Sequence, residues 1–236
     1  MKGVYLKRKL NNFCRWLKDR PYEIRRFFTK LFLKNRKFTI ISNNCWAGRT
    51  YQYLDMPYLS PTVGLYFFAP DYIKFVSDLR RYLEMPLEFI EASESKYYEV
   101  LKERNQTDKP IGLLGDVEIV FLHYKSQAEV KEKWERRKAR VNFNNIIIKM
   151  SRMDLCTEKE IQGFDSLPFK NKFFLNNRLP LKYKSEVYWK EDWREEGIYR
   201  DTEPFPGNIS LVKLLGKQPE RYNIIKTNGD MNNAVD

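Results

Sequence analysis

The chain alternates between short apolar runs and longer segments in which apolar residues recur at helical spacing. Runs rich in β-branched and aromatic residues predict strands over 38–41, 62–68, 87–90, 116–124, 146–148, 172–175 and 186–189. Helical spacing predicts helices over 70–83, 96–104, 127–142 and 158–167. Strands separated by helices imply right-handed crossovers. The expected fold class is therefore α/β, a three-layer α/β/α domain with a mostly parallel sheet.

One predicted helix, 127–142, carries especially clear local signals. Ser126 is a suitable N-cap, and Glu129 follows three residues later, which is the spacing of a capping box. Glu129 and Lys133 are four residues apart with the acid first, the favoured order for an ion pair on a helix. Trp134 is expected in the core rather than as a platform for a sugar ring.

The first 37 residues have a different pattern from the rest of the chain. Apolar residues recur at helical spacing in two sets, before and after Pro21, and Lys and Arg surround both sets. The sets are Leu6, Leu10, Phe13 and Leu17, and then Ile24, Phe27, Phe28, Leu31 and Phe32. We therefore expect a basic amphipathic helical arm over 1–37, an α/β domain over 38–215, and a polar, partly disordered tail over 216–236.

The positive charge of the chain is concentrated in this arm. Residues 1–37 hold 13 Lys and Arg against two acidic residues, whereas the formal net charge of all 236 residues is +12. The rest of the chain is thus almost neutral, which argues against nucleic acid as a partner of the domain. Basic amphipathic helices bind anionic membrane surfaces, and this is one interpretation of the arm. In the other, its helices pack on the domain and the charges are solvated.

The sequence also constrains where the protein is expected to act. No apolar run reaches the roughly 18 residues of a membrane span, and charged residues interrupt every candidate signal peptide. The expected location is therefore cytoplasmic, with the arm holding the protein peripherally on the inner face of the cell membrane.

Cysteine and histidine usage limits the chemistry. Cys14, Cys45 and Cys156 are too few and too widely spaced for a disulfide framework or a zinc ribbon. His123 is the only histidine, which excludes a His-rich metal centre. No metal and no resident cofactor are therefore expected.

The stretch Ser42–Gly48 follows the predicted strand 38–41 and has the composition of a functional loop. Its small polar residues, cysteine and glycine predict a turn, with a helix starting shortly afterwards. Ligands bind open α/β sheets at loops that follow the carboxyl ends of strands. Cys45 lies on such a loop, and His123 ends the predicted strand 116–124. If the two strands are parallel neighbours, both residues emerge at the same edge of the sheet.

Several sequence blocks occur in the order found in a known family. They are 42–46 (SNNCW), 60–62 (SPT), 116–124 (DVEIVFLHY), 133–142 (KWERRKARVN) and 165–168 (DSLP). Over roughly residues 38 to 215 the chain resembles the domain-of-unknown-function family 1919. The bacterial members of this family are often labelled exopolysaccharide-biosynthesis proteins and sometimes acyltransferases. The resemblance implies a polysaccharide or capsule context, supplies no reaction, and leaves the arm outside it.

Cys45 and His123 together suggest acyl transfer. A thiolate is the reactive form of cysteine, and a helix N-terminus or a nearby imidazolium favours it. In this mechanism Cys45 attacks the carbonyl of an acyl thioester donor, His123 moves the proton and Asn44 holds the oxyanion. Glu91, which follows the predicted strand 87–90, is the residue expected to orient His123.

Each of these residues also has a structural interpretation. A free cysteine is often a small buried apolar side chain, and this interpretation of Cys45 is slightly favoured over the catalytic one. His123 can cap its strand through backbone hydrogen bonds, and the asparagines of the loop can stabilise tight turns.

Substrate contacts are expected from the loop and from charged residues elsewhere. Arg137 and Arg140 share a helical face, where they can hold the phosphate of a nucleotide sugar or of a lipid-linked pyrophosphate. A solvated charged face is the commoner outcome for such residues. The expected substrate-binding residues are Asn43, Trp46, Asp116, Glu118, Arg137 and Arg140.

Three functions remain open from the sequence. The leading hypothesis is an enzyme of capsule or exopolysaccharide synthesis that transfers an acyl group to a sugar or a lipid-linked saccharide. The second is a glycosyltransferase-like enzyme of the same pathway, in which Asp116, Glu118 and the arginines matter and Cys45 does not. The third is a non-catalytic accessory protein at the membrane surface.

Overall fold

The structure is a computed structural model that describes residues 21–189, 197–198, 201 and 211–215. Its centre is a four-stranded sheet of β1 (Thr39–Ser42), β5 (Ile146–Ser151), β6 (Lys172–Asn176) and β7 (Glu186–Tyr188), in that order. All three neighbouring pairs are parallel. The predicted α/β class with a mostly parallel sheet is confirmed.

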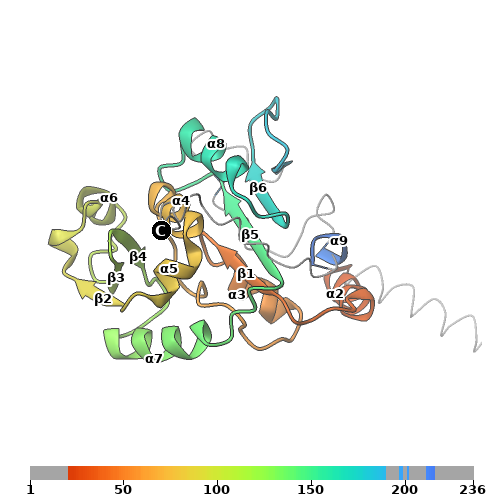
Figure 1. The fold of residues 1–236 in the computed structure, drawn as a ribbon, viewed down its shortest axis with the longest axis horizontal. Helices are drawn as coiled ribbons and strands as arrows, with labels where there is room; N and C mark the ends of the chain where they lie inside the picture. Colours follow the sequence, from red (N-terminus) through yellow and green to blue (C-terminus); the bar gives the residue numbers. More distant parts are fainter. Residues whose placement is uncertain (1–20, 190–196, 199–200, 202–210, 216–236) are drawn as a thin grey trace, which may run out of the picture.

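Alternate residues of each strand point to opposite faces of this sheet, so both faces carry apolar side chains. Helices cover both faces. Ile41 and Ile148 belong to one hydrophobic cluster, while Ile40 and Ile147 belong to another. The first cluster includes side chains of α4 (Ala69–Ser77), α5 (Leu79–Glu84), α7 (Gln127–Lys138) and α8 (Glu158–Ser166). The second includes side chains of α3 (Trp46–Tyr53) and α9 (Leu211–Leu215). This arrangement is the expected three-layer architecture (Figure 1).

A second sheet was not expected. It is antiparallel and consists of β2 (Glu88–Ile90), β3 (Ile111–Leu114) and β4 (Val117–Val120). The prediction that 116–124 forms a parallel neighbour of 38–41 is wrong, because a turn of only two residues, Gly115 and Asp116, joins β3 to β4. Gly115 has φ +61°, a conformation that glycine adopts without strain. Such a short turn can connect only antiparallel strands.

The predicted strand 62–68 is also wrong. It forms no strand among the described residues and contributes an isolated bridge between Tyr66 and Val120 of β4. Gly64 interrupts the extended backbone with φ +76°. Gly64 therefore bends the segment, and the bent segment forms part of the wall of the candidate site.

The helix signals in 127–142 were largely correct, although α7 ends at Lys138. The Ser126 hydroxyl accepts the Glu129 backbone N–H at 3.2 Å. The Glu129 carboxylate reaches the backbone N–H of Lys125 at 2.9 Å, one residue before the expected partner. The Lys133 ammonium lies 2.5 Å from a Glu129 oxygen, as the spacing predicted.

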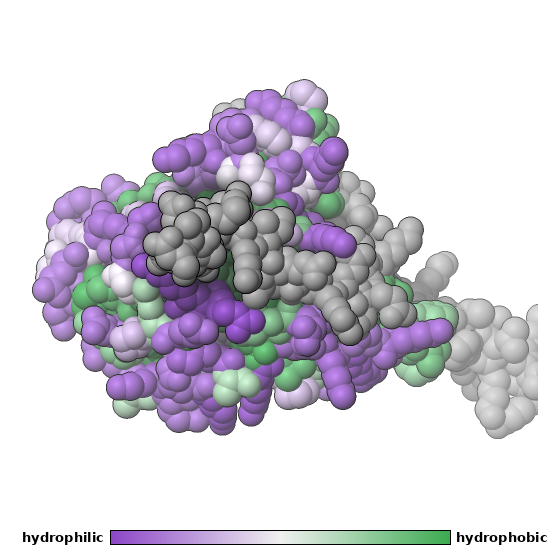
Figure 2. All heavy atoms as spheres, viewed as in Figure 1, coloured by the Kyte–Doolittle hydropathy of each residue, from purple (hydrophilic) through white to green (hydrophobic). Residues whose placement is uncertain are grey.

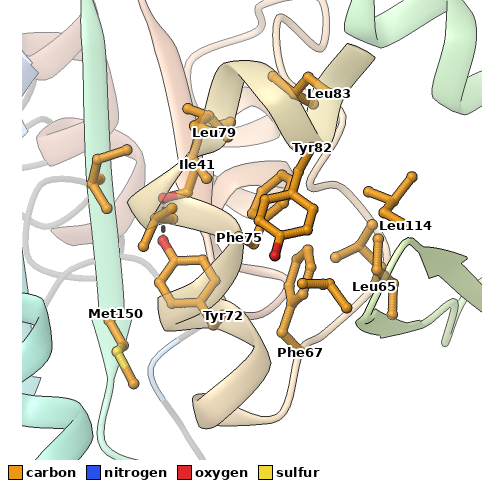
Figure 3. Close-up of a cluster of buried hydrophobic side chains, with 14 of the residues drawn as sticks. Ile41, Leu65, Phe67, Tyr72, Phe75, Leu79, Tyr82, Leu83, Leu114 and Met150 are labelled. Carbon is orange, nitrogen blue, oxygen red and sulfur yellow. Dashed lines mark hydrogen bonds between the residues drawn. The ribbon is translucent and has the colours of Figure 1, made fainter. Parts of the chain in front are cut away.

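The first hydrophobic cluster joins the two sheets into one body. In Figure 3, Phe75 of α4 lies between Ile41 of β1 and Leu114 of β3, and Leu79 of α5 belongs to the same cluster. The Tyr72 hydroxyl lies 2.9 Å from the Ile41 carbonyl oxygen and 2.8 Å from that of Lys149, so it ties α4 to β1 and β5. The small sheet is therefore fixed relative to the parallel one. Two short helices, η1 (Ala92–Glu94) and α6 (Tyr98–Glu103), connect β2 to β3.

Part of the predicted arm is described. Its second apolar set lies on α2 (Pro21–Phe32), which is helical as expected. Arg26 and Lys30 form ion pairs with Asp55 and so fasten α2 to the end of α3. The first set and the tail lie outside the described residues. None of the described helices combines the length and apolarity needed to cross a bilayer.

Candidate functional site

A pocket of about 380 Å³ opens between the parallel sheet and the small sheet. Its walls come from the first turns of α3, the bent segment 58–64, the turn after β4 and one face of α7. Cys45 and His123 both line it. The two residues therefore converge as the sequence suggested, although not through neighbouring parallel strands.

Cys45 occupies the N-cap position of α3 and is half-buried. Its sulfur lies 3.8 Å from the Leu65 carbonyl oxygen, which is a weak contact. Burial, aided by the negative charge of Asp201, raises the pKa of the Cys45 thiol to about 11. The thiol is therefore protonated near neutral pH, whereas an activated cysteine nucleophile is a thiolate.

His123 reaches the same pocket from the turn that follows β4, and its side chain is exposed. Its backbone N–H donates to the Gly64 carbonyl at 3.0 Å, which continues the pairing begun by Tyr66 and Val120. A Cβ atom on Gly64 would lie 3.1 Å from the Tyr124 ring, and φ at this residue is +76°. Gly64 thus allows the turn that carries His123 to approach the rest of the pocket.

Basic side chains dominate the pocket wall. Arg137 is only 7% exposed, and its Nη1 donates to the Tyr124 hydroxyl at 2.5 Å and to the Val63 carbonyl at 3.3 Å. Its guanidinium carbon lies 4.8 Å from the centre of the Tyr58 ring. Arg49 and Lys133 also line the pocket, and none of the described lining residues is acidic.

A fully buried polar cluster lies behind the Cys45 loop. Lys149 and Asp201 are 0% and 1% exposed and form an ion pair. Asn44 accepts from the Lys149 ammonium at 3.0 Å and donates to both Asp201 carboxylate oxygens at 3.0 and 2.9 Å. The Ser151 hydroxyl donates to Asp201 at 2.5 Å. Burial lowers the pKa of Lys149, and the Asp201 carboxylate opposes that shift.

These contacts change the role expected for Asn44. Its side-chain oxygen also accepts the Trp46 backbone N–H at 3.1 Å, so it caps α3 from within the cluster. Because the amide group is occupied on both sides, it is not free to hold an oxyanion in the pocket. Asn43 is similarly occupied, since it exchanges hydrogen bonds of 3.2 and 3.0 Å with the backbone of Ser151.

Two predicted substrate contacts, Trp46 and Arg140, and the predicted catalytic residue Glu91 do not line the pocket. Trp46 is fully buried against Phe173 and belongs to the core. Arg140 is exposed and donates to the Tyr58 carbonyl at 3.2 Å from outside the pocket lining. Glu91 is the N-cap of η1, where it shares a capping box with Glu94. It does not line the pocket with His123.

The two carboxylates considered for glycosyl transfer also have other partners. Asp116 lies in the β3–β4 turn, where the Lys74 ammonium and the Tyr82 hydroxyl contact it at 2.9 and 2.7 Å. These hydrogen bonds lower the pKa of Asp116 to about 2. Glu118 is buried and accepts from the Ser95 hydroxyl at 2.5 Å and from the Lys96 backbone at 3.1 Å. Neither carboxylate lines the pocket.

Sequence reasoning missed several residues of the pocket wall. Arg49, Tyr58 and Gly64 carried no separate signal, because their segments meet only in the folded chain. Lys133 could have been found, since it is four residues before Arg137 and shares its helical face. Within the part of the chain that the structure describes, no three His, Cys, Asp or Glu side chains are placed to hold a metal ion.

Comparison with known proteins gives two similarities. A family model described as a domain of unknown function (DUF1919) matches residues 18–203. A Haemophilus influenzae protein described as uncharacterized is 37% identical over 158 residues, which cover 67% of this chain and 70% of that protein. The family match includes α2, so the expectation that the arm lies wholly outside the family is wrong for its second half.

Replacing Lys149 with Met is expected to destabilise the fold by about 3–5 kcal/mol, because Asp201 would remain buried without its cation. Urea denaturation gives the free energy of unfolding. Lys159→Met, at an exposed position, is the matched control and should change little. The double variant K149M/D201N should recover part of the loss. A K149M protein as stable as the wild type would show that the pair is not formed.

Cys45 should react slowly with alkylating reagents, because its raised pKa keeps the thiolate scarce. In a C14S/C156S variant, iodoacetamide should react roughly 100-fold more slowly than with a thiol whose pKa is about 9. The rate should still rise about tenfold per pH unit from about pH 7.5 to 9.5. A plateau below about pH 9 would show that the folded protein stabilises the thiolate.

Proposed function

The chain belongs to the DUF1919 family, and on that premise we propose that it is a transferase of surface-polysaccharide synthesis. It moves an acyl group from a thioester donor to the hydroxyl of a sugar or a lipid-linked saccharide. The observation that carries this proposal is that His123 lines a pocket that is open to solvent.

In the proposed reaction His123 acts as the general base. The imidazole takes the proton of the sugar hydroxyl as that oxygen attacks the thioester carbonyl. The tetrahedral intermediate then collapses, the carbon–sulfur bond breaks, and the departing thiolate takes the proton back from the imidazolium. Imidazole suits both steps because one ring nitrogen can accept a proton and then donate it back. The acyl group passes directly between the two substrates, without a covalent enzyme intermediate.

Direct transfer fits Cys45 better than a thiol mechanism. A nucleophilic cysteine needs a thiolate, whereas the pKa of Cys45 is raised to about 11. Its described polar contact is the Leu65 carbonyl, not the imidazole of His123. Cys45 therefore contributes a small, neutral part of the pocket wall. Glycosyl transfer is less well supported, since Asp116 and Glu118 have other partners outside the pocket.

The exposed face of α2 supports a second part of the proposal, docking to an anionic membrane surface. Phe27, Leu31 and Phe32 are 63%, 61% and 59% exposed, an unusual fraction for large apolar side chains on one short helix. In Figure 2, hydrophobic and hydrophilic groups lie side by side at the α2 edge of the molecule.

Charge favours an anionic bilayer as the occupant of this face. The opposite side of α2 is fastened to Asp55, so the aromatic side chains are held outward. Lys34, Arg36 and Lys37 follow the helix directly, and each basic residue near an anionic surface contributes roughly 1 kcal/mol. Docking would place the pocket near lipid-linked saccharides.

Replacing His123 with Gln should lower transfer roughly 100-fold to 10,000-fold, the usual contribution of a general base. Replacing Cys45 with Ala should leave it within about tenfold of the wild type, since no covalent intermediate is formed. A strain lacking the protein is complemented with each variant, and ester-linked acyl groups on its surface polysaccharide are measured by NMR.

The exposed neighbour Lys125 provides the control, because K125Q removes a charge outside the pocket lining. Acylation that survives H123Q would exclude the general base. Acylation lost in C45A but kept in H123Q would restore the thiol mechanism. Acylation unchanged in the deletion strain would remove acyl transfer altogether.

The docking proposal predicts that F27S/L31S binds vesicles of phosphatidylserine and phosphatidylcholine at least about tenfold more weakly than the wild type. Sedimentation with vesicles measures the bound fraction. The control L179S alters a leucine that is also 63% exposed but lies far along the chain from α2. Equal binding by F27S/L31S, or no binding by the wild type, would contradict docking. A change from dimer to monomer would instead assign this face to a second copy of the chain.

A further inference from the structure

We infer that the pocket is a binding site for a diphosphate group, carried either by the saccharide substrate or by the thioester donor. The inference deepens the proposed function, because it takes the same pocket and names the class of ligand that occupies it. It depends on the charges, contacts and shape of the wall.

The charge of the wall matches a diphosphate diester. The Lys133 ammonium is paired with Glu129, an acid on its own helix. Arg49 and Arg137 also line the pocket, and among the described residues neither has a carboxylate partner. Within the described part of the chain, two guanidinium groups thus have no negative counterpart. A diphosphate that is esterified at both ends carries two negative charges and would neutralise them.

Arg137 is held in a position suited to phosphate. Its Nη1 is fixed by the Tyr124 hydroxyl and the Val63 carbonyl, and the Tyr58 ring lies against the guanidinium plane. Nε and Nη2 make no hydrogen bond with any residue that the structure describes. One edge of this nearly buried fork thus has no partner among the described residues, and two parallel N–H groups are the geometry that binds phosphate oxygens.

The opposite wall brings a helix N-terminus close to this fork. Gly48, in the first turn of α3, lines the pocket, and a Cβ atom there would lie 3.0 Å from Val63 Cγ1. The absence of that Cβ lets α3 approach the segment on which Arg137 rests. The partial positive charge of the α3 N-terminus adds to that of the two guanidinium groups. Tyr58 and Tyr124 supply flat surfaces for the organic part of the ligand.

Three kinds of molecule share this chemistry. A nucleotide sugar and coenzyme A are soluble diphosphate diesters, and a lipid-linked saccharide carries its diphosphate at the membrane. The acyl donor and the acceptor of the proposed reaction can therefore both meet the pocket through the same group. Only direct binding distinguishes them.

Isothermal titration calorimetry tests the inference, with inorganic pyrophosphate as the first probe. The full-length wild type should bind it. Arg49→Gln should weaken binding about tenfold and Arg137→Gln should weaken it more, because each removes charge-assisted hydrogen bonds. Arg137→Lys keeps the charge and loses the fork, so its affinity for pyrophosphate should lie between those of the two glutamine variants. Coenzyme A and uridine diphosphate glucose, both diphosphate diesters, are then compared with farnesyl diphosphate, a monoester that stands in for the lipid-linked source.

Arg136 provides the matched control. It neighbours Arg137 on α7, pairs with Glu132 at 3.4 Å on an exposed face and does not line the pocket. R136Q should bind pyrophosphate as the wild type does, and thermal unfolding checks that every variant is folded. R49Q is the decisive variant if R137Q fails to fold, because Arg49 is exposed.

Two results would overturn the inference. One is a wild type that binds none of the four probes, and the other is an R136Q variant that loses as much affinity as R49Q, which would indicate bulk charge. Binding is measured without turnover. A protein that binds pyrophosphate through Arg49 and Arg137 but transfers no acyl group would therefore refute the proposed reaction and leave this site standing.

Discussion

The buried ion pair between Lys149 and Asp201 is the constraint on which the candidate site depends. Two charges removed from water require close partners, and Asn44 and Ser151 complete their hydrogen bonds. Asn44 also caps α3, so the cluster fixes where that helix begins. Cys45, Gly48 and Arg49 follow directly in the chain. A polar group at the carboxyl ends of β1 and β5 thus sets the position of one entire wall of the pocket.

The opposite wall depends on a different feature, the small antiparallel sheet. Its strand β4 pairs through Val120 with Tyr66, and the same pairing continues to His123 and Gly64. Gly64 bends the chain directly after Val63, and the Val63 carbonyl and the Tyr124 hydroxyl both accept hydrogen bonds from Arg137 of α7. The pocket therefore lies at the boundary between two sheets, and neither sheet contains it alone. This arrangement brings a histidine, a thiol and several cations together from four separate segments.

The proposed chemistry follows from which groups are occupied and which are free. Asn43, Asn44, Glu118 and Trp46 resembled functional residues because they are polar or aromatic and lie beside strand ends. Each of these side chains is buried against a structural partner. They therefore determine the shape of the fold around the site and do not contact substrate. His123 and Arg49 are exposed on the wall and keep their polar groups available. A site for an anionic substrate with one general base is the result.

The sequence by itself determined the α/β class, the strands of the parallel sheet, the capped helix α7 and the helical second half of the arm. Those features follow from local periodicity and end signals, which any short segment carries within itself. The sequence also identified Cys45 and His123 as residues that could share a site, and Arg137 as a residue that could bind a phosphate. Only the tertiary structure decided that His123 follows a strand of an antiparallel sheet, that Lys149 and Asp201 pair beneath the loop, and that Arg49 and Arg137 line the same pocket. Such contacts join residues far apart in the chain, and no local pattern of hydrophobic and polar positions encodes which distant segments will meet.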